Sequence, residues 1–258
     1  MSEFSGECAA MSASPAFQRL KFESLRMAAG GIVHEFNNHL AAIDGNNNIL
    51  LGQLDENSTL GMHARLLQDA TDLALILTQR LTIYASRVDP QFISFDLQTF
   101  LESSLSTLQK LAPPHQLTIE FESAPPQVSA DANLLRTSLE CLVSNAHESM
   151  IDKEGAVTIT AGSSLSHGSI DFFFDFPPPE NPFFFVEVSD SGCGMLPSVL
   201  SRIFDPFFST KIRGHGMGLP CVFGVTRLHS GNISVQTEPD QGTTVTMVLP
   251  LEPKNDFV

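Results

Sequence analysis

The chain has few basic residues, and no apolar run in it is long enough to cross a membrane. Its 14 lysines and arginines stand against 29 acidic residues, giving a formal net charge of −15. This balance argues against non-specific binding to nucleic acid or to an anionic membrane surface. No stretch resembles a transmembrane helix or a signal peptide. We therefore expect no nucleic-acid partner, no membrane span in this chain and a cytoplasmic location.

Cysteine is also scarce. The four cysteines, Cys8, Cys141, Cys193 and Cys221, are far apart, and none forms a C-x-x-C pair. This spacing excludes the common zinc and disulfide frameworks and favours reduced cytosolic thiols. The 258 residues suffice for one large domain or two small ones with a hydrophobic core.

Two amphipathic helices are predicted within 17–88, after a flexible N-terminal segment, 1–16. At about 100° per residue, Leu25, Ile32, Phe36 and Ile43 fall within roughly 20° of one direction over the first helix, 17–54. Their spacing of seven, four and seven is typical of a coiled coil. His34 lies about 180° from this stripe, so geometry places it outside the packed face.

A loop at 52–61 leads to a second helix over 62–86, and the pair forms a helical hairpin. Its apolar residues recur every three or four positions, at Leu66, Ala70, Leu73, Leu77, Leu81 and Tyr84. A two-helix hairpin cannot cover both of its apolar stripes. We therefore expect a second copy to complete a four-helix bundle, which makes the protein a homodimer.

The composition changes near Asp89-Pro90, and strands then mix with helices. The pattern predicts helices at 97–111, 131–150 and 219–228 and strands at 117–122, 156–162, 183–190, 232–238 and 243–250. This order favours an α+β two-layer sandwich over 92–253. The segment 172–185, FFFDFPPPENPFFF, has two interpretations: a hairpin with phenylalanines against the sheet, or an exposed patch that binds a partner.

Five short motifs follow one another in this second region: SNAHE, DSGCGM, FDPFFSTK, GHGMGL and GTTV. Each is weak alone, but their order and spacing make coincidence improbable. Asp190 ends a strand, where its carboxylate can accept a hydrogen bond from the exocyclic amine of adenine. Gly192 and Gly194 let the backbone approach the flat base.

The other motifs suit a phosphate chain. Asn145 offers an amide oxygen to Mg²⁺, a hard cation that prefers oxygen. Gly214, Gly216 and Gly218 leave backbone N–H groups for phosphate oxygens, with a helix N-terminus behind them. Lys211 adds a positive charge nearby. We expect ATP and Mg²⁺ as cofactors.

With these motifs, the chain resembles a two-component sensor histidine kinase over about 17–251. The resemblance implies a dimerisation and histidine-phosphotransfer hairpin, followed by an ATP-binding domain of the gyrase–Hsp90–kinase–MutL (Bergerat) type. Its acceptor box, HEFNN, is most similar to that of nitrogen-regulation kinases. The five motifs resemble the family's nucleotide boxes, the last of which includes Thr243.

The resemblance also implies the roles of the acceptor residues. His34 is the phosphoacceptor, Glu35 helps to deprotonate it, and Asn38 positions water for phosphatase activity. An aspartate on a response regulator then receives the phosphoryl group. The chemistry of these side chains agrees with the implied roles, because a neutral imidazole is a competent nucleophile and a neighbouring carboxylate can take its proton.

Two departures keep alternatives open. The family often has a second asparagine where this chain has Cys141, and no sensor module precedes the hairpin. A scaffold that binds nucleotide without phosphorylation and a hydrolytic ATPase of the same superfamily are the competing hypotheses. The signal is expected from a separate sensor protein, the N-terminal segment or a region absent from this sequence.

Overall fold

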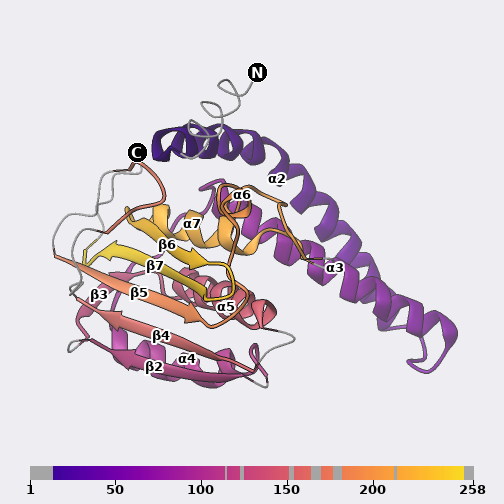
Figure 1. Ribbon diagram of the computed structural model, residues 1–258. Coiled ribbons are helices and arrows are strands. Elements are labelled where there is room, and N and C mark those ends of the chain that lie inside the picture. Colours follow the sequence, from indigo (N-terminus) through magenta and orange to yellow (C-terminus); the bar gives the residue numbers. More distant parts are fainter. Residues whose placement is uncertain are drawn as a thin grey trace.

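The computed structural model describes residues 14–113, 115–122, 125–150, 154–163, 170–176, 182–211 and 214–252. It has two parts, a helical hairpin and a sheet covered by helices (Figure 1). The hairpin followed by an α+β sandwich confirms the predicted fold class. The predicted segment 1–16 lies outside this description except for its last three residues.

The hairpin consists of α2 (Pro15–Leu51) and α3 (Thr59–Tyr84). The helix α2 begins two residues earlier than predicted, because Ser14 caps it and Pro15 suits the first turn. The helix α3 begins three residues earlier than predicted, and the Ser58 hydroxyl accepts from the Gly61 N–H at its N-terminus. Figure 1 shows the two helices side by side, extending well beyond the sheet.

A polar contact sets the register between the two helices. Asn47 is only 1% exposed, and its Nδ2 donates to the Ala64 carbonyl at 2.9 Å and to Gln68 Oε1 at 2.8 Å. The Gln68 amide in turn donates to Asp44. A sliding of one helix along the other would break this chain of hydrogen bonds, so it favours one alignment.

In its described residues, the second part comprises three longer helices, one short helix and seven strands. They are β1 (Ile93–Asp96), α4 (Leu97–Gln109), β2 (Gln116–Phe121), β3 (Gln127–Ala130), α5 (Ala132–Ser149), β4 (Ala156–Gly162), β5 (Phe183–Asp190), α6 (Pro197–Leu200), α7 (Gly218–Leu228), β6 (Asn232–Glu238) and β7 (Gly242–Pro250). Every helix and strand predicted for this part is present. The prediction did not include β1, β3 and α6, each of which has four residues.

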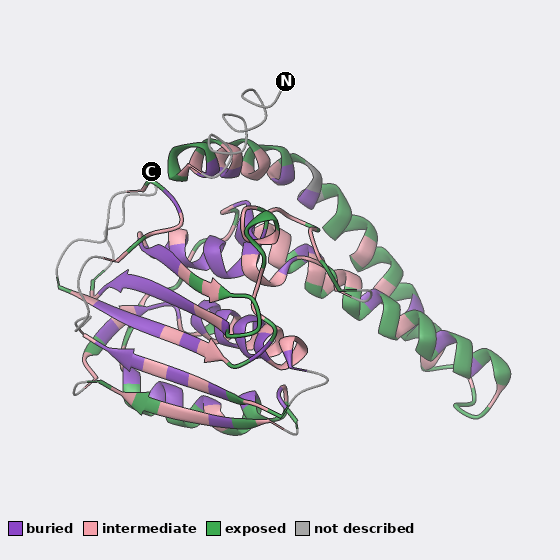
Figure 2. Ribbon diagram, viewed as in Figure 1, coloured by how far each residue is buried: buried purple, intermediate pink, exposed green. Residues whose placement is uncertain are grey.

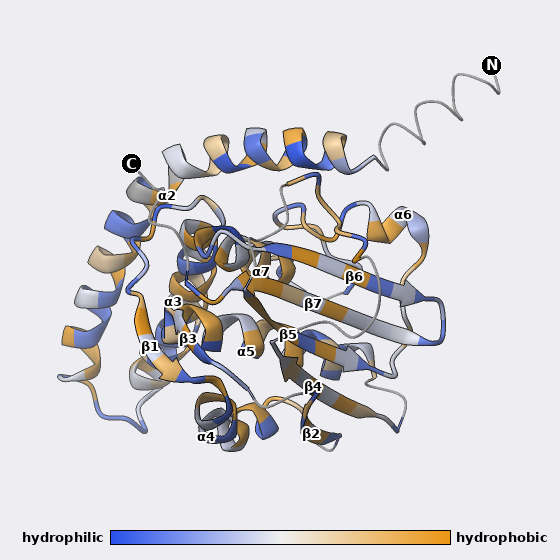
Figure 3. Ribbon diagram, turned by 90° about the vertical axis from the view of Figure 1, so that its left-hand side faces the viewer, coloured by the Kyte–Doolittle hydropathy of each residue, from blue (hydrophilic) through white to orange (hydrophobic). Residues whose placement is uncertain are grey.

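The main sheet has the strand order β2-β4-β5-β7-β6, and β1 pairs separately with β3. Only β2 and β4 run parallel; the other neighbours in the main sheet are antiparallel. Helices α4, α5 and α7 cover one face of this sheet (Figures 1 and 3). The last residue of β5, Asp190, pairs with Thr243 near the start of β7, so two of the predicted site residues meet at one edge.

The phenylalanine-rich segment packs inward where the structure describes it. Phe174 is 2% exposed and stacks on Phe223 of α7, with ring centroids 3.9 Å apart. Phe22 of α2 also contacts both Phe223 and Phe174. Phe174, Phe184 and Phe185 therefore pack inward, and the segment helps to join the hairpin to the sandwich. The predicted hairpin is wrong, because Phe172 bridges Ser234 of β6, and β5 pairs with β4 and β7. The proline-rich turn at 177–181 lies outside the described residues.

Candidate functional site

The predicted nucleotide motifs surround one cavity of about 470 Å³ at the end of α5 and the start of α7. Its lining includes eight of the nine predicted cofactor-binding residues: Asn145, Asp190, Gly194, Lys211, Gly214, Gly216, Gly218 and Thr243. The ninth, Gly192, lies next to it and donates its N–H to Asp190 Oδ1 at 2.8 Å. Residues more than 90 positions apart in the chain are thus brought together as the motifs predict.

Asp190 is fixed by hydrogen bonds at the end of β5. Its Oδ1 accepts from the Gly192 N–H and from Ser149 Oγ, the latter at 2.9 Å. Burial raises the pKa of the Asp190 carboxyl, although both of these hydrogen bonds act to lower it. A positioned, partly desolvated carboxylate can accept strongly from a ligand's amine.

The glycines of the DSGCGM motif leave no room for side chains. Gly194 has a φ of +60°, and a Cβ there would lie 1.9 Å from the Glu238 carbonyl oxygen. The backbone of this turn therefore lies directly against the start of the β6–β7 turn. This close approach explains why the motif needs glycine at this position.

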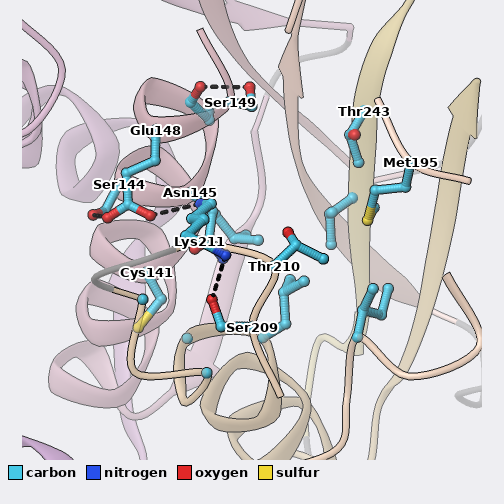
Figure 4. A pocket seen from close by; sticks show the side chains of 18 of the residues that line it. Cys141, Ser144, Asn145, Glu148, Ser149, Met195, Ser209, Thr210, Lys211 and Thr243 are labelled. Carbon is cyan, nitrogen blue, oxygen red and sulfur yellow. Dashed lines mark hydrogen bonds and ion pairs between the residues drawn. The ribbon is translucent and has the colours of Figure 1, made fainter. Parts of the chain in front are cut away.

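Further polar side chains of α5 line the cavity beside Lys211. Asn145 lines the cavity, and Glu148, one turn later, forms an ion pair with Lys211 with Nζ and Oε2 2.5 Å apart (Figure 4). Ser144 also donates to Glu148, at 3.4 Å. Lys211 is thus at the predicted position, but its charge is already balanced by a neighbouring carboxylate.

The donors in this part of the cavity fit Mg²⁺. The amide of Asn145 supplies an oxygen ligand, and Mg²⁺ is commonly held by one or two protein oxygens together with substrate phosphates. Among the described residues, no group of three or more His, Cys, Asp or Glu side chains could bind a metal ion alone. The site therefore suits an ion that arrives with a nucleotide.

The residues predicted to take part in the acceptor step lie on α2 and are not part of this cavity's lining. Glu35 and Asn38 are exposed on the helix. The backbone of His34 is part of α2, but its side chain lies outside the described residues, so its predicted exposure stays a prediction. Within the described ranges, neither α2 nor any other helix combines the length and the hydropathy needed to cross a bilayer.

The phenylalanines of FDPFFSTK have different surroundings. Phe204 is 5% exposed and contacts Phe173, Phe174 and Phe223, whereas Phe207 is 63% exposed and has a φ of +65°. Phe208 lines the cavity beneath the Arg202 guanidinium. Phe204 is therefore part of the hydrophobic core and anchors this loop, whereas Phe207 does not.

Several lining residues were missed from the sequence, among them the polar residues Ser149 and Arg80. Ser149 lies four residues after Asn145, so the helical period could have placed it on the same face of α5. Arg80 comes from α3 and has no such signal, because only the packing of the hairpin on the sandwich brings it to the cavity.

Comparison with known proteins agrees with this arrangement. Residues 130–253 match the family described as histidine kinase-, DNA gyrase B- and HSP90-like ATPase. The chain is 28% identical over 241 residues to the sensor histidine kinase ZraS of Escherichia coli strain K12, covering 90% of this chain and 46% of ZraS. It is 27% identical to sporulation kinase C of Bacillus subtilis strain 168, covering 91% of this chain and 52% of that protein. The chain thus spans about half the length of these relatives.

Solved structures show the same fold. Full-length ShkA in complex with AMPPNP superimposes with a TM-score of 0.68 at 22% identity, over 88% of this chain and 46% of ShkA. The histidine kinase ThkA, solved in complex with the response regulator TrrA, has a TM-score of 0.55 at 19% identity, over 92% of this chain and 65% of that one. Both likenesses include the hairpin as well as the sandwich, because each covers most of this chain.

Proposed function

We propose that this chain transfers the γ-phosphoryl group of ATP to His34 and then to an aspartate of a response regulator. The proposal starts from the likeness of the chain to the sensor histidine kinases of two-component systems. The observation that carries the proposal is the single cavity lined by Asn145, Asp190 and the GHGMGL loop, in a chain whose other part bears the HEFNN box. Neither feature alone would distinguish a kinase from another ATP-binding protein.

In this proposal the sandwich binds both the adenine and the phosphates of ATP. The Asp190 carboxylate accepts from the adenine amine, with Gly192, Gly194 and Thr243 beside the base. The N–H groups of the GHGMGL loop and Lys211 meet the phosphates, with Gly214, Gly216 and Gly218 giving the loop its open backbone. Asn145 would hold Mg²⁺, which would neutralise phosphate charge.

The acceptor step needs no other cofactor. An unprotonated nitrogen of His34 attacks the γ-phosphorus, so that an N–P bond forms while the bond from phosphorus to the ADP oxygen breaks. Glu35 takes the imidazole proton. In the second step the phosphoryl group passes to a carboxylate oxygen of the regulator's aspartate, and His34 is regenerated. Asn38, exposed one turn after His34, would position water for the removal of that phosphoryl group from the regulator.

The assembly belongs to the same proposal. The hairpin, 17–88, would dimerise with a second copy, and 92–253 would form the catalytic domain. Support comes from large apolar side chains that α2 and α3 leave exposed, including Phe36 at 57% and Leu66 at 62%. A response regulator would dock on the hairpin near His34, in the cytoplasm, with the signal supplied by another protein or segment.

Labelling with γ-labelled ATP and Mg²⁺ tests the proposed activity. We expect acid-labile, base-stable label on the protein, abolished by His34→Gln and retained in His39→Gln, which changes an exposed histidine five residues later on the same helix. ATP binding without label would favour a nucleotide-binding scaffold. Steady phosphate release that persists in His34→Gln would favour a hydrolytic ATPase.

A further inference from the structure

The cavity receives one side chain from the hairpin, that of Arg80 on α3. Every other described residue of the lining belongs to the sandwich, from Cys141 onward. Arg80 lies one turn before Tyr84, on the same face of α3. Tyr84 is fully buried and packs edge-on against Phe22, with ring centroids 5.1 Å apart. Arg80 is therefore carried by the best-anchored end of α3.

The neighbouring helix α7 holds this end of α3 at close range. A Cβ added to Gly224 of α7 would lie 2.7 Å from the Ile83 carbonyl oxygen, so the two helices approach at backbone contact. The same helix α7 begins at Gly218, which lines the cavity. The packing thus fixes Arg80 relative to the glycine loop expected to bind phosphate.

The positive charge of Arg80 acts at the Asn145 end of the cavity. Arg80 shares the lining with Cys141, which lies one turn before Asn145 on α5. A hydrogen bond from Cys221 lowers the pKa of the Cys141 thiol, and the Arg80 charge acts in the same direction. The phosphates of a bound nucleotide are expected beside Asn145 and the glycine loop, in this part of the lining.

Arg80 differs from Lys211 in having no acidic partner among the described residues. Lys211 is paired with Glu148, whereas no ion pair links Arg80 to any carboxylate in the part of the chain that the structure describes. Arg80 is half-buried. A guanidinium that is partly removed from water and has no carboxylate partner favours an anionic ligand. Its planar fork of donors matches phosphate oxygens.

We propose that Arg80 is a phosphate-binding residue of the nucleotide site, supplied by the hairpin to the sandwich. Its guanidinium donates hydrogen bonds to phosphate oxygens of bound ATP. ATP therefore binds most tightly when the hairpin is packed on the sandwich, and by linkage it stabilises that packed arrangement. This inference rests on the proposed ATP binding and adds a ligand contact from outside the sandwich.

Calorimetric titration of the full chain with a non-hydrolysable ATP analogue and Mg²⁺ tests the inference. We expect Arg80→Gln to weaken the analogue about tenfold, the usual cost of losing one charge-assisted hydrogen-bonded contact. Adenosine, which lacks phosphates, should bind equally to both proteins in competition experiments. Arg80→Lys keeps the charge without the fork and should fall between wild type and Arg80→Gln.

Arg65→Gln is the matched control, because Arg65 lies on the same helix but is exposed beside Glu56. It should bind the analogue as wild type does. Unchanged affinity in Arg80→Gln would overturn the inference, and so would an equal loss for adenosine, which would mean a role in folding only. A wild-type protein that binds ATP but acquires no label at His34 would contradict the proposed function and leave this measurement valid.

Discussion

The sandwich and the hairpin use apolar residues differently. In the sandwich, Phe184, Val222 and Leu249 are fully buried within one chain, whereas on the hairpin Phe36, Leu66 and Ile76 are between 46% and 62% exposed. Figure 2 shows the contrast: buried residues dominate the strands and α7, and exposed residues dominate the far halves of α2 and α3. The core of the sandwich, which includes Phe22 and Tyr84 from the hairpin, is complete within one chain, whereas the far halves of α2 and α3 leave large apolar side chains exposed.

The contrast explains why the two halves of α2 differ. Near its N-terminus, Phe22 joins the aromatic cluster of the sandwich, and Lys21 forms an ion pair with Asp205 with Nζ and Oδ1 2.5 Å apart. Further along, the predicted stripe residues Phe36 and Ile43 are 57% and 44% exposed. The cavity is thus formed within one chain, while the apolar surface of α2 around His34 would need the proposed second copy to cover it.

Gly194→Ala should have the largest effect. The added Cβ would meet the Glu238 carbonyl at 1.9 Å in a left-handed backbone, so we expect a loss on the order of 3 kcal/mol in the free energy of unfolding and no measurable ATP binding. Urea denaturation and calorimetry measure both. The same change in the hairpin, Gly31→Ala, meets open space and should stabilise α2 slightly. Equal changes in the free energy of unfolding for Gly194→Ala and Gly31→Ala would contradict the proposed difference between the sandwich and the hairpin.

Leu66→Glu should act on assembly instead of on the fold of the chain. Placing a carboxylate on the exposed apolar face of α3 should weaken the proposed dimer by about 2 kcal/mol or more, while ATP affinity stays unchanged. Light scattering across protein concentrations measures the dissociation. Ile93→Glu, the same kind of change at an exposed position of β1, is the control. A wild-type chain that is monomeric at micromolar concentration would contradict the proposed dimer.

The sequence predicted the elements of both parts better than their contacts. Long periodic segments such as 131–150 were recognisable, because a packed face repeats over several turns. The four-residue strands β1 and β3 have too few positions to show a period. The intrachain face of α2, at Phe22, Ala29 and Val33, lies about 60° from the predicted stripe. Both apolar faces of α2 can be recognised in the sequence, but only the packed structure shows which face is buried within the chain and which is exposed. Arg80 could not be placed for the same reason.

Asp190→Asn should have the smallest effect on stability and a clear effect on binding. Burial raises the pKa of Asp190 in the folded state, so the carboxyl favours folding while protonated and becomes unfavourable as the pH rises through that raised pKa. The neutral amide avoids this cost. We expect the variant without nucleotide to be more stable than wild type at neutral pH, by at most about 1 kcal/mol, and equal or less stable in acid.

Urea denaturation between pH 3 and pH 8 measures this crossing, with and without ADP. ADP should stabilise wild type but not Asp190→Asn, because the amide presents a donor as well as an acceptor to the adenine amine. Asp69→Asn changes an exposed acid of the hairpin and should show neither the crossing nor the loss of ADP stabilisation. A variant that is less stable than wild type at neutral pH would mean that the hydrogen bonds from Ser149 and Gly192 outweigh the burial of the charge. Asp190 would then stabilise the folded sandwich at neutral pH. Of the two parts, only the hairpin would keep an unfavourable feature, its exposed apolar side chains.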